Sequence, residues 1–187
     1  MSVSHREKQL LDYHLKIRSP LMVTTALVLS AVVSYVFISI DLSSYQRSLS
    51  ADINRFGLIS KYEFVLRQST PGVVWLLLCV LYCIYKRLIT SNAIPGTRHE
   101  PLMAESQRIL NNSLEQFVIH IFTLLILVSY IDQEHLIVKT VLVLNALFII
   151  GRVLFWLGYP KYRAVGYSLH FIPISFVLFY ISYRYFV

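Results

Sequence analysis

Three polar residues begin a long apolar segment of the chain. Arg108, Asn112 and Glu115 precede a run without Lys, Arg, Asp or Glu that continues to Ile131. In an α-helix, spacings of four and three residues place these side chains on one face. That face would present a guanidinium, an amide and a carboxylate. A guanidinium suits carboxylate anions and a carboxylate suits an ammonium group, so the face could bind a small molecule with both charges.

A second polar stripe lies in and just after the apolar run of residues 136–157. Asn145, Arg152 and Tyr159 recur every seven residues, so they share one face of a predicted helix. Arg152 is the unfavourable member, because a charge inside an apolar helix usually faces the bundle interior beside a partner. We expect Glu115 to be that partner, since both residues lie toward the same end of neighbouring antiparallel helices.

Two interpretations of these residues remain open. In the first, Arg152 and Glu115 form a structural ion pair that holds helices together, with the amides in support. In the second, the polar residues line a pocket that opens toward the cytosol and holds a small anionic molecule. Lys86 and Arg87, which end an earlier apolar run, would then add positive charge.

The composition indicates an integral membrane protein. Of the 187 residues, 56% are hydrophobic and 14% are charged, whereas a soluble domain has about a quarter charged residues. The net charge of +7 comes from basic residues that flank apolar runs, so lipid headgroups explain it better than nucleic acid. Runs of about 20 apolar residues suit membrane-spanning helices. We expect five such spans, at residues 21–40, 72–88, 109–131, 136–157 and 165–186, with a kink at Pro173 in the last.

These spans define the predicted organisation of the chain. It comprises a cytosolic leader, an additional transmembrane helix, a lumenal loop and a four-helix domain, at residues 1–20, 21–40, 41–70 and 71–187. A short interfacial helix is expected around residues 53–66. Residues 90–107 contain Pro and Gly and are predicted to form a loop.

The distribution of Lys and Arg favours a cytosolic N-terminus. The leader, the connection after the second span and the turn after the fourth together contain ten of these residues. The connections on the opposite side contain at most six. Because cytosolic loops are enriched in Lys and Arg, the side with ten is assigned to the cytosol.

Three motifs resemble those of the MAPEG family, the membrane-associated proteins in eicosanoid and glutathione metabolism. Arg108-x-x-x-Asn112-x-x-Glu115 at the start of an apolar helix is similar to the family signature. The segment GRVLFWLGY, residues 151–159, resembles the family's third helix, which contains an arginine and ends in a tyrosine. Lys86-Arg87 resembles the basic pair at the end of the first helix. The resemblance covers about residues 70–187.

The resemblance implies an all-α membrane protein whose MAPEG-like four-helix bundle follows one additional transmembrane helix and assembles as a trimer. Family members bind glutathione between subunits. The positions that match, and that would contact glutathione, are Arg108, Asn112, Glu115, Arg152, Tyr159, Lys86 and Arg87.

This chain also departs from the family pattern. Gln116 and Phe155 stand where the enzymes often have tyrosine. Active members have an arginine early in the fourth helix that stabilises the glutathione thiolate, and the corresponding position here is Gly166, Tyr167 or Ser168, none of which is basic. Tyr167 could donate a hydrogen bond to a thiolate. Arg163 is the nearest cation and is the other candidate for that role.

An additional span before a MAPEG-like region resembles the mattrin type, a divergent branch associated with secretory and lysosomal membranes. The resemblance implies a multi-span protein of the endoplasmic reticulum, Golgi or lysosome with a degenerate glutathione site and no catalysis. Its partners would be the lipid bilayer, further copies of the chain and other membrane proteins. The alternative is a glutathione-dependent transferase or peroxidase that uses Tyr167 or Arg163. A transporter is disfavoured, because the five spans contain no inverted repeat.

Several residues within the predicted spans have structural interpretations. We expect His120 to make a hydrogen bond between helices, Asn145 to join helices, and His170 to bond a backbone group that Pro173 frees. Cys79 and Cys83 are predicted to pack as small apolar residues. No metal site is expected, because His99 and Glu100 form a pair of ligands without further partners.

Overall fold

The computed structural model describes residues 19–39, 47, 58–89 and 100–187. These residues form helices, and the described part of the chain contains no strand. The helices are α2 (Ser19–Ser39), α4 (Leu58–Gln68), α5 (Thr70–Ile89), α6 (Glu100–Tyr130), α7 (Glu134–Leu157) and α8 (Arg163–Phe186). The predicted all-α architecture is therefore confirmed.

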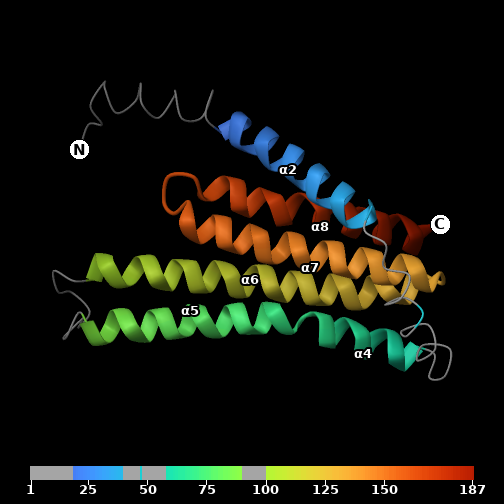
Figure 1. Ribbon diagram of the computed structural model, residues 1–187, viewed down its shortest axis with the longest axis horizontal. Coiled ribbons are helices and arrows are strands. Elements are labelled where there is room, and N and C mark those ends of the chain that lie inside the picture. Colours follow the sequence, from blue (N-terminus) through green and yellow to red (C-terminus); the bar gives the residue numbers. More distant parts are fainter. Residues whose placement is uncertain (1–18, 40–46, 48–57, 90–99) are drawn as a thin grey trace.

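Helices α5 to α8 lie side by side, and α2 crosses α8 obliquely on the far side of the bundle from α5 (Figure 1). Successive long helices run in opposite directions. The end of α5, the beginning of α6 and the turn between α7 and α8 therefore lie at the same end of the bundle (Figure 1). The polar residues that the sequence analysis selects on α6, α7 and α8 lie toward this end.

The predicted membrane spans correspond closely to the helices. In the part of the chain that the structure describes, four segments are long and apolar enough to cross a membrane: Leu58–Ile89, Met103–Tyr130, His135–Leu157 and Arg163–Phe186. The additional first span corresponds to α2, whose 21 residues give a length of roughly 32 Å at 1.5 Å per residue. Its apolar part, Leu21–Val36, is shorter than in the other four. Helix α8 continues through Pro173 to Phe186.

The short helix expected in the loop of residues 41–70 is α4, and it leads almost directly into α5. The Ser69 hydroxyl donates to the Val65 carbonyl at 2.8 Å, and the Gly72 amide donates to the Ser69 carbonyl at 2.9 Å. Pro71 in the first turn of α5 has no amide hydrogen, and a helix leaves that position unpaired in any case. Phe64 and Val65 of α4 are buried against α6 and α7.

The prediction of a loop over residues 90–107 is wrong for its last part, because α6 begins at Glu100. Pro101 lies in the first turn, where a helix tolerates proline. Met103, Ser106 and Ile109 are buried at spacings of three residues, so the first turns already pack against the bundle. Residues 90–99 lie outside the described residues.

Two glycines allow α7 and α8 to pack with their backbones in close approach. A Cβ atom on Gly166 would clash with the Phe155 nitrogen and the Gly151 carbonyl oxygen. A Cβ atom on Gly151 would lie 2.8 Å from the Gly166 carbonyl oxygen. Small residues are typical of close helix contacts in membranes. This contact sets which residues of α8 face the site.

Helix α2 joins the bundle through a small residue as well. Ala26 is fully buried and packs with Leu147 of α7 and Leu169 of α8. A larger apolar cluster fills the end of the bundle near the turn between α6 and α7. Its buried members are Phe64, Val65, Leu124, Leu127, Val128, Ile137, Val138, Val141, Leu144 and Ile181.

Candidate ligand-binding pocket

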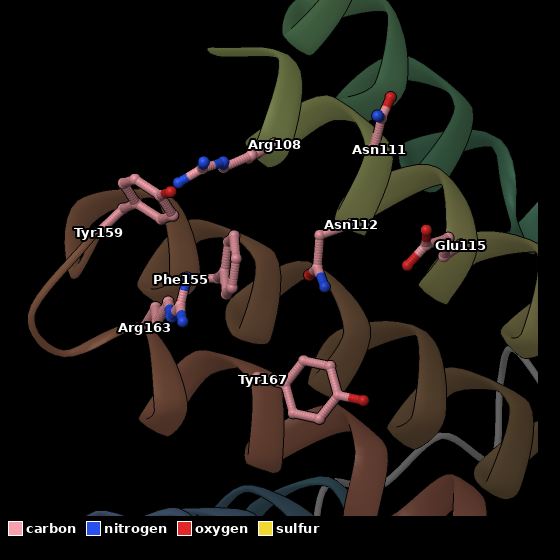
Figure 2. Close-up of a pocket in the computed structure, with 8 residues that line it drawn as sticks. All are labelled: Arg108, Asn111, Asn112, Glu115, Phe155, Tyr159, Arg163 and Tyr167. Atoms are coloured by element: carbon pink, nitrogen blue, oxygen red, sulfur yellow. The ribbon is translucent and has the colours of Figure 1, made fainter. Parts of the chain in front are cut away.

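A pocket of about 450 Å³ lies between the first half of α6, the end of α7 and the beginning of α8 (Figure 2). Its lining combines charged, amide and aromatic side chains. The residues are Arg108, Asn111, Asn112 and Glu115 of α6, Phe155 of α7, Tyr159 of the turn, and Arg163 and Tyr167 of α8. The structure thus brings together most of the residues that the sequence analysis selects, although they are up to 59 positions apart.

The walls of the pocket have opposite charges. The exposed guanidinium groups of Arg108 and Arg163 lie on one side, and the Arg108 side chain points toward Tyr159 (Figure 2). The Arg163 guanidinium carbon is 5.8 Å from the centre of the Tyr159 ring, a cation–π distance. Glu115 is also exposed and lies further along α6 (Figure 2). The pocket can therefore contact an anion at one end and a cation at the other.

Arg152 does not line the pocket but lies behind its wall. Its side chain is fully buried, and Nη1 donates to Asn112 Oδ1 at 2.7 Å. The guanidinium carbon lies 5.2 Å from the Phe155 ring centre and 5.8 Å from that of Phe148. Within the described residues, Nε and Nη2 have no hydrogen-bond partner. A buried guanidinium with two unpaired nitrogens is unfavourable, and it adds positive potential behind Asn112 and Phe155.

The expected ion pair between Arg152 and Glu115 is wrong for the single chain. The amide oxygen of Asn112 accepts from Arg152 instead, while Glu115 remains exposed on the pocket wall. Asn112 lies one turn nearer the end of the bundle where α7 finishes, and it points inward between the helices (Figure 2). Glu115 is thus available to a ligand or to another chain.

Lys86 and Arg87 do not reach this pocket either. Both lie in the last turn of α5, and the Lys86 ammonium is 5.4 Å from the centre of the Tyr82 ring on the same helix. Their predicted contribution to the pocket is not made within one chain.

The structure decides which residue of α8 faces the pocket. Gly166 faces the backbone of α7, and Ser168 is buried. Tyr167 is the member of the three that lines the pocket, opposite Asn112 (Figure 2). Arg163, one turn earlier, lines it too. Both residues therefore line the pocket, and the position of α8 opposite Asn112 is a tyrosine instead of an arginine.

A hydrogen-bonded network crosses the bundle beyond the pocket. His120 Nε2 is 3.1 Å from Asn145 Oδ1, and His120 Nδ1 is 3.1 Å from His170 Nε2. His170 Nδ1 is 3.1 Å from the side-chain amide of Gln116. The predicted interhelical roles of His120 and Asn145 are confirmed. The predicted backbone contact of His170 is wrong, because its ring nitrogens are engaged by side chains of α6 at both positions.

Asn111 and Phe155 line the pocket but were not among the predicted site residues. Asn111 neighbours Asn112 in the family motif, but its side chain points away from Asn112 (Figure 2). Phe155 lies four residues before Tyr159, one helical turn away, and this spacing was the available signal. Among the described residues, no group of three or more His, Cys, Asp or Glu could hold a metal ion. His99 lies outside them.

The groups that line the pocket can be compared with those of glutathione, the ligand that the family resemblance implies. Glutathione has two carboxylates and one ammonium group. Arg108 and Arg163 offer guanidinium forks to the carboxylates, and Glu115 offers a carboxylate to the ammonium. Tyr167 offers a hydroxyl. The buried Arg152 strengthens the attraction for a net negative molecule.

Comparisons with known proteins identify the family of the chain. The model of the MAPEG family matches residues 71–183, which is more than half of the chain. Transmembrane protein 79 of Bos taurus is 33% identical over 78 residues, covering 40% of this chain and 19% of that protein. Transmembrane protein 79 of Mus musculus matches to the same extent. The chain thus aligns with about a fifth of the length of these relatives.

No solved structure matches the chain. The family match covers α5 to α8 almost completely, and all residues that line the polar pocket lie within it. The four-helix bundle, the pocket at one end and the Arg-Asn-Glu face of α6 lead to one conclusion: this multi-span membrane protein belongs to the MAPEG family.

Proposed function

We propose that the polar pocket binds glutathione or a closely similar peptide anion, and that this binding is not catalytic. The observation that supports the proposal is the lining itself: two exposed guanidinium groups and one exposed carboxylate converge on a cavity of about 450 Å³. Arg108 and Arg163 would hold carboxylates and Glu115 would hold the ammonium group. Asn112 is engaged by Arg152 and would keep the wall in place.

We expect no turnover because Tyr167, and not an arginine, occupies this position of α8. A thiol reacts as its thiolate, and a cation stabilises a thiolate far better than a neutral group does. The pocket position on α8 nearest Asn112 holds a phenol, and Arg163 lies one turn away with its charge directed at the Tyr159 ring. The site therefore supports recognition of the ligand's charges more than activation of its sulfur.

Calorimetric titration can show whether binding depends on the charged groups of the ligand or on its thiol. Glutathione and ophthalmic acid, in which a methyl group replaces the thiol, should bind the detergent-purified protein with similar affinity, because the charged groups are the same. Glu115→Gln should weaken both equally, whereas Glu105→Gln, an exposed change one turn before Arg108, should weaken neither. If neither compound binds the wild-type protein, the proposal is wrong.

A second candidate function is a glutathione-dependent transferase, which is favoured by the presence of both Tyr167 and Arg163 at the pocket. The ultraviolet absorbance of the bound thiolate would test it. An enzyme should lower the thiol pKa of bound glutathione and conjugate it to a general electrophile, with loss of both effects in Tyr167→Phe or Arg163→Gln. A thiol pKa equal to that of free glutathione would exclude this candidate.

The setting of the protein is also part of the proposal. We infer that the chain spans secretory or endolysosomal membranes with its N-terminus in the cytosol, as the excess of Lys and Arg on that side supports. Like the mattrin type that it resembles, it would act through contacts with lipids or other membrane proteins. Copies of the chain would assemble as trimers, as the family resemblance suggests, and exposed Glu115 would lie near a neighbouring copy.

A further inference from the structure

A second cavity, of about 210 Å³, lies in an apolar groove between α5, α6 and α7. Four of its residues form a stripe on α5, and α6 and α7 contribute one each. They are Trp75, Leu78, Cys79, Tyr82, Ile109 and Trp156. None of them lines the polar pocket.

Aromatic rings build the wall of this groove. Trp156 meets Trp75 edge to face with ring centres 6.3 Å apart, and it meets Tyr82 in the same way at 5.8 Å. Such pairs are favourable arrangements that hold the rings in defined orientations. The groove opens at the surface of the bundle, since Leu78 is 53% and Trp156 is 41% exposed.

The groove continues into the basic end of α5. Tyr82 and Lys86 are one turn apart on the same face, and the Lys86 ammonium lies 5.4 Å from the Tyr82 ring centre. Arg87 follows and is exposed. Helix α5 contains no Asp or Glu. Its 20 residues span roughly 30 Å, so its last turn lies at the level of the lipid headgroups.

We propose that this groove binds one acyl chain of an anionic phospholipid and that Lys86 and Arg87 bind its phosphate. The apolar aromatic wall matches a hydrocarbon chain at membrane depth. The adjacent pair of cations at headgroup depth matches a net negative headgroup better than a zwitterionic one. Neither basic residue lines the polar pocket of its own chain, and the assignment does not depend on glutathione binding.

The chain contains its own reporter for this site. Its two tryptophans, Trp75 and Trp156, both line the groove. Bromine atoms on an acyl chain quench tryptophan fluorescence when they come into contact with the indole. The protein would be reconstituted in phosphatidylcholine vesicles that contain a small, fixed fraction of either phosphatidylglycerol or phosphatidylcholine with brominated chains.

The wild-type protein should be quenched several-fold more by brominated phosphatidylglycerol than by brominated phosphatidylcholine at equal mole fraction. The double variant Lys86→Gln/Arg87→Gln should lose this preference. Lys86→Arg/Arg87→Lys keeps both charges and should retain it. Lys161→Gln, which removes an exposed cation in the turn after α7, is the matched control and should retain it too.

Two results would overturn the proposal. Equal quenching by both lipids in the wild-type protein would show that the groove contacts bulk lipid without selection. A preference that persists in Lys86→Gln/Arg87→Gln would show that these cations do not bind the headgroup. Because each variant is compared with itself in two lipids, a change in the number of folded molecules does not affect the ratio.

Discussion

Arg152 and Asn112 connect α7 to the polar face of α6 at the level of single residues. The guanidinium is fully buried, and the amide oxygen of Asn112 is its hydrogen-bond acceptor among the described residues. The pair lies directly behind the pocket, so it determines the shape of the wall and contributes positive potential there. A neutral amide performs this role while leaving the Glu115 carboxylate at the pocket surface.

Substitution of Asn112 tests this arrangement. Asn112→Leu removes the acceptor while retaining a side chain of similar size, and it should lower the free energy of unfolding by about 1.5–3 kcal/mol, the contribution of a hydrogen bond to a charged group. Chemical denaturation in detergent micelles measures the change. Asn111→Leu, at the exposed neighbouring position, should shift stability by less than about 0.5 kcal/mol. Equal effects of the two substitutions would show that the buried hydrogen bond is not important for stability.

At the scale of helices, the contact between α7 and α8 determines the site. Gly151 and Gly166 let the two backbones approach, and this approach sets Tyr167 at the pocket and Gly166 against Phe155. Helix α6 holds Arg108, Asn112 and Glu115 beside this contact. Its first turns are fixed in place because Met103 and Ile109 are buried.

Gly166→Ala should disrupt this contact. The added methyl group would meet backbone atoms of Phe155 and Gly151, which cannot move away as a flexible side chain can. We expect a loss of about 1–3 kcal/mol in the free energy of unfolding together with weaker glutathione binding, because Tyr167 would shift with the helix. Ser182→Ala, an exposed small change on the same helix, should alter neither property. A Gly166→Ala protein with wild-type stability would contradict the close packing.

The helices and their order could be predicted from the sequence, because runs of apolar residues that cross a membrane are long and clear. The grouping of Arg108, Asn112 and Glu115 followed from helical periodicity. The partner of Arg152 could not be predicted, since Asn112 and Glu115 lie on the same face and their rotation relative to α7 depends on packing. The position of Tyr167 likewise depends on Gly166, whose contact with α7 no local pattern reveals. The start of α6 was missed because Pro101 indicates a loop unless it falls in a first turn.

At the scale of the whole molecule, the turns and helix ends of the bundle gather at two opposite ends. The end of α5, the beginning of α6 and the turn after α7 lie at one end, and the turn between α6 and α7 lies at the other (Figure 1). The first end contains Lys86, Arg87, Arg108, Lys161 and Arg163. With the four Lys and Arg residues of the leader, these cations give the excess that supports the proposed cytosolic orientation of this end and of the mouth of the pocket.

Labelling with an impermeant maleimide tests this orientation. Cys79 and Cys83 are buried, so an introduced cysteine should give the dominant signal. In sealed microsomes, Lys161→Cys should react without permeabilisation, and Asp132→Cys, in the turn between α6 and α7, should react only after it. The reverse pattern would place the pocket on the lumenal side, where another pool of ligands would reach it.

The proposed function depends on recognition of glutathione by the charged groups of the polar pocket. Thermal unfolding of the purified protein with and without glutathione tests this recognition, in the wild type beside Glu115→Gln and Glu105→Gln. A ligand that binds the folded state stabilises it by about 2.7 kcal/mol at a hundredfold excess over its dissociation constant. We expect a higher unfolding temperature with glutathione in the wild type and in Glu105→Gln, and a much smaller increase in Glu115→Gln. An unchanged unfolding temperature in the wild type, or an equal increase in all three proteins, would contradict it.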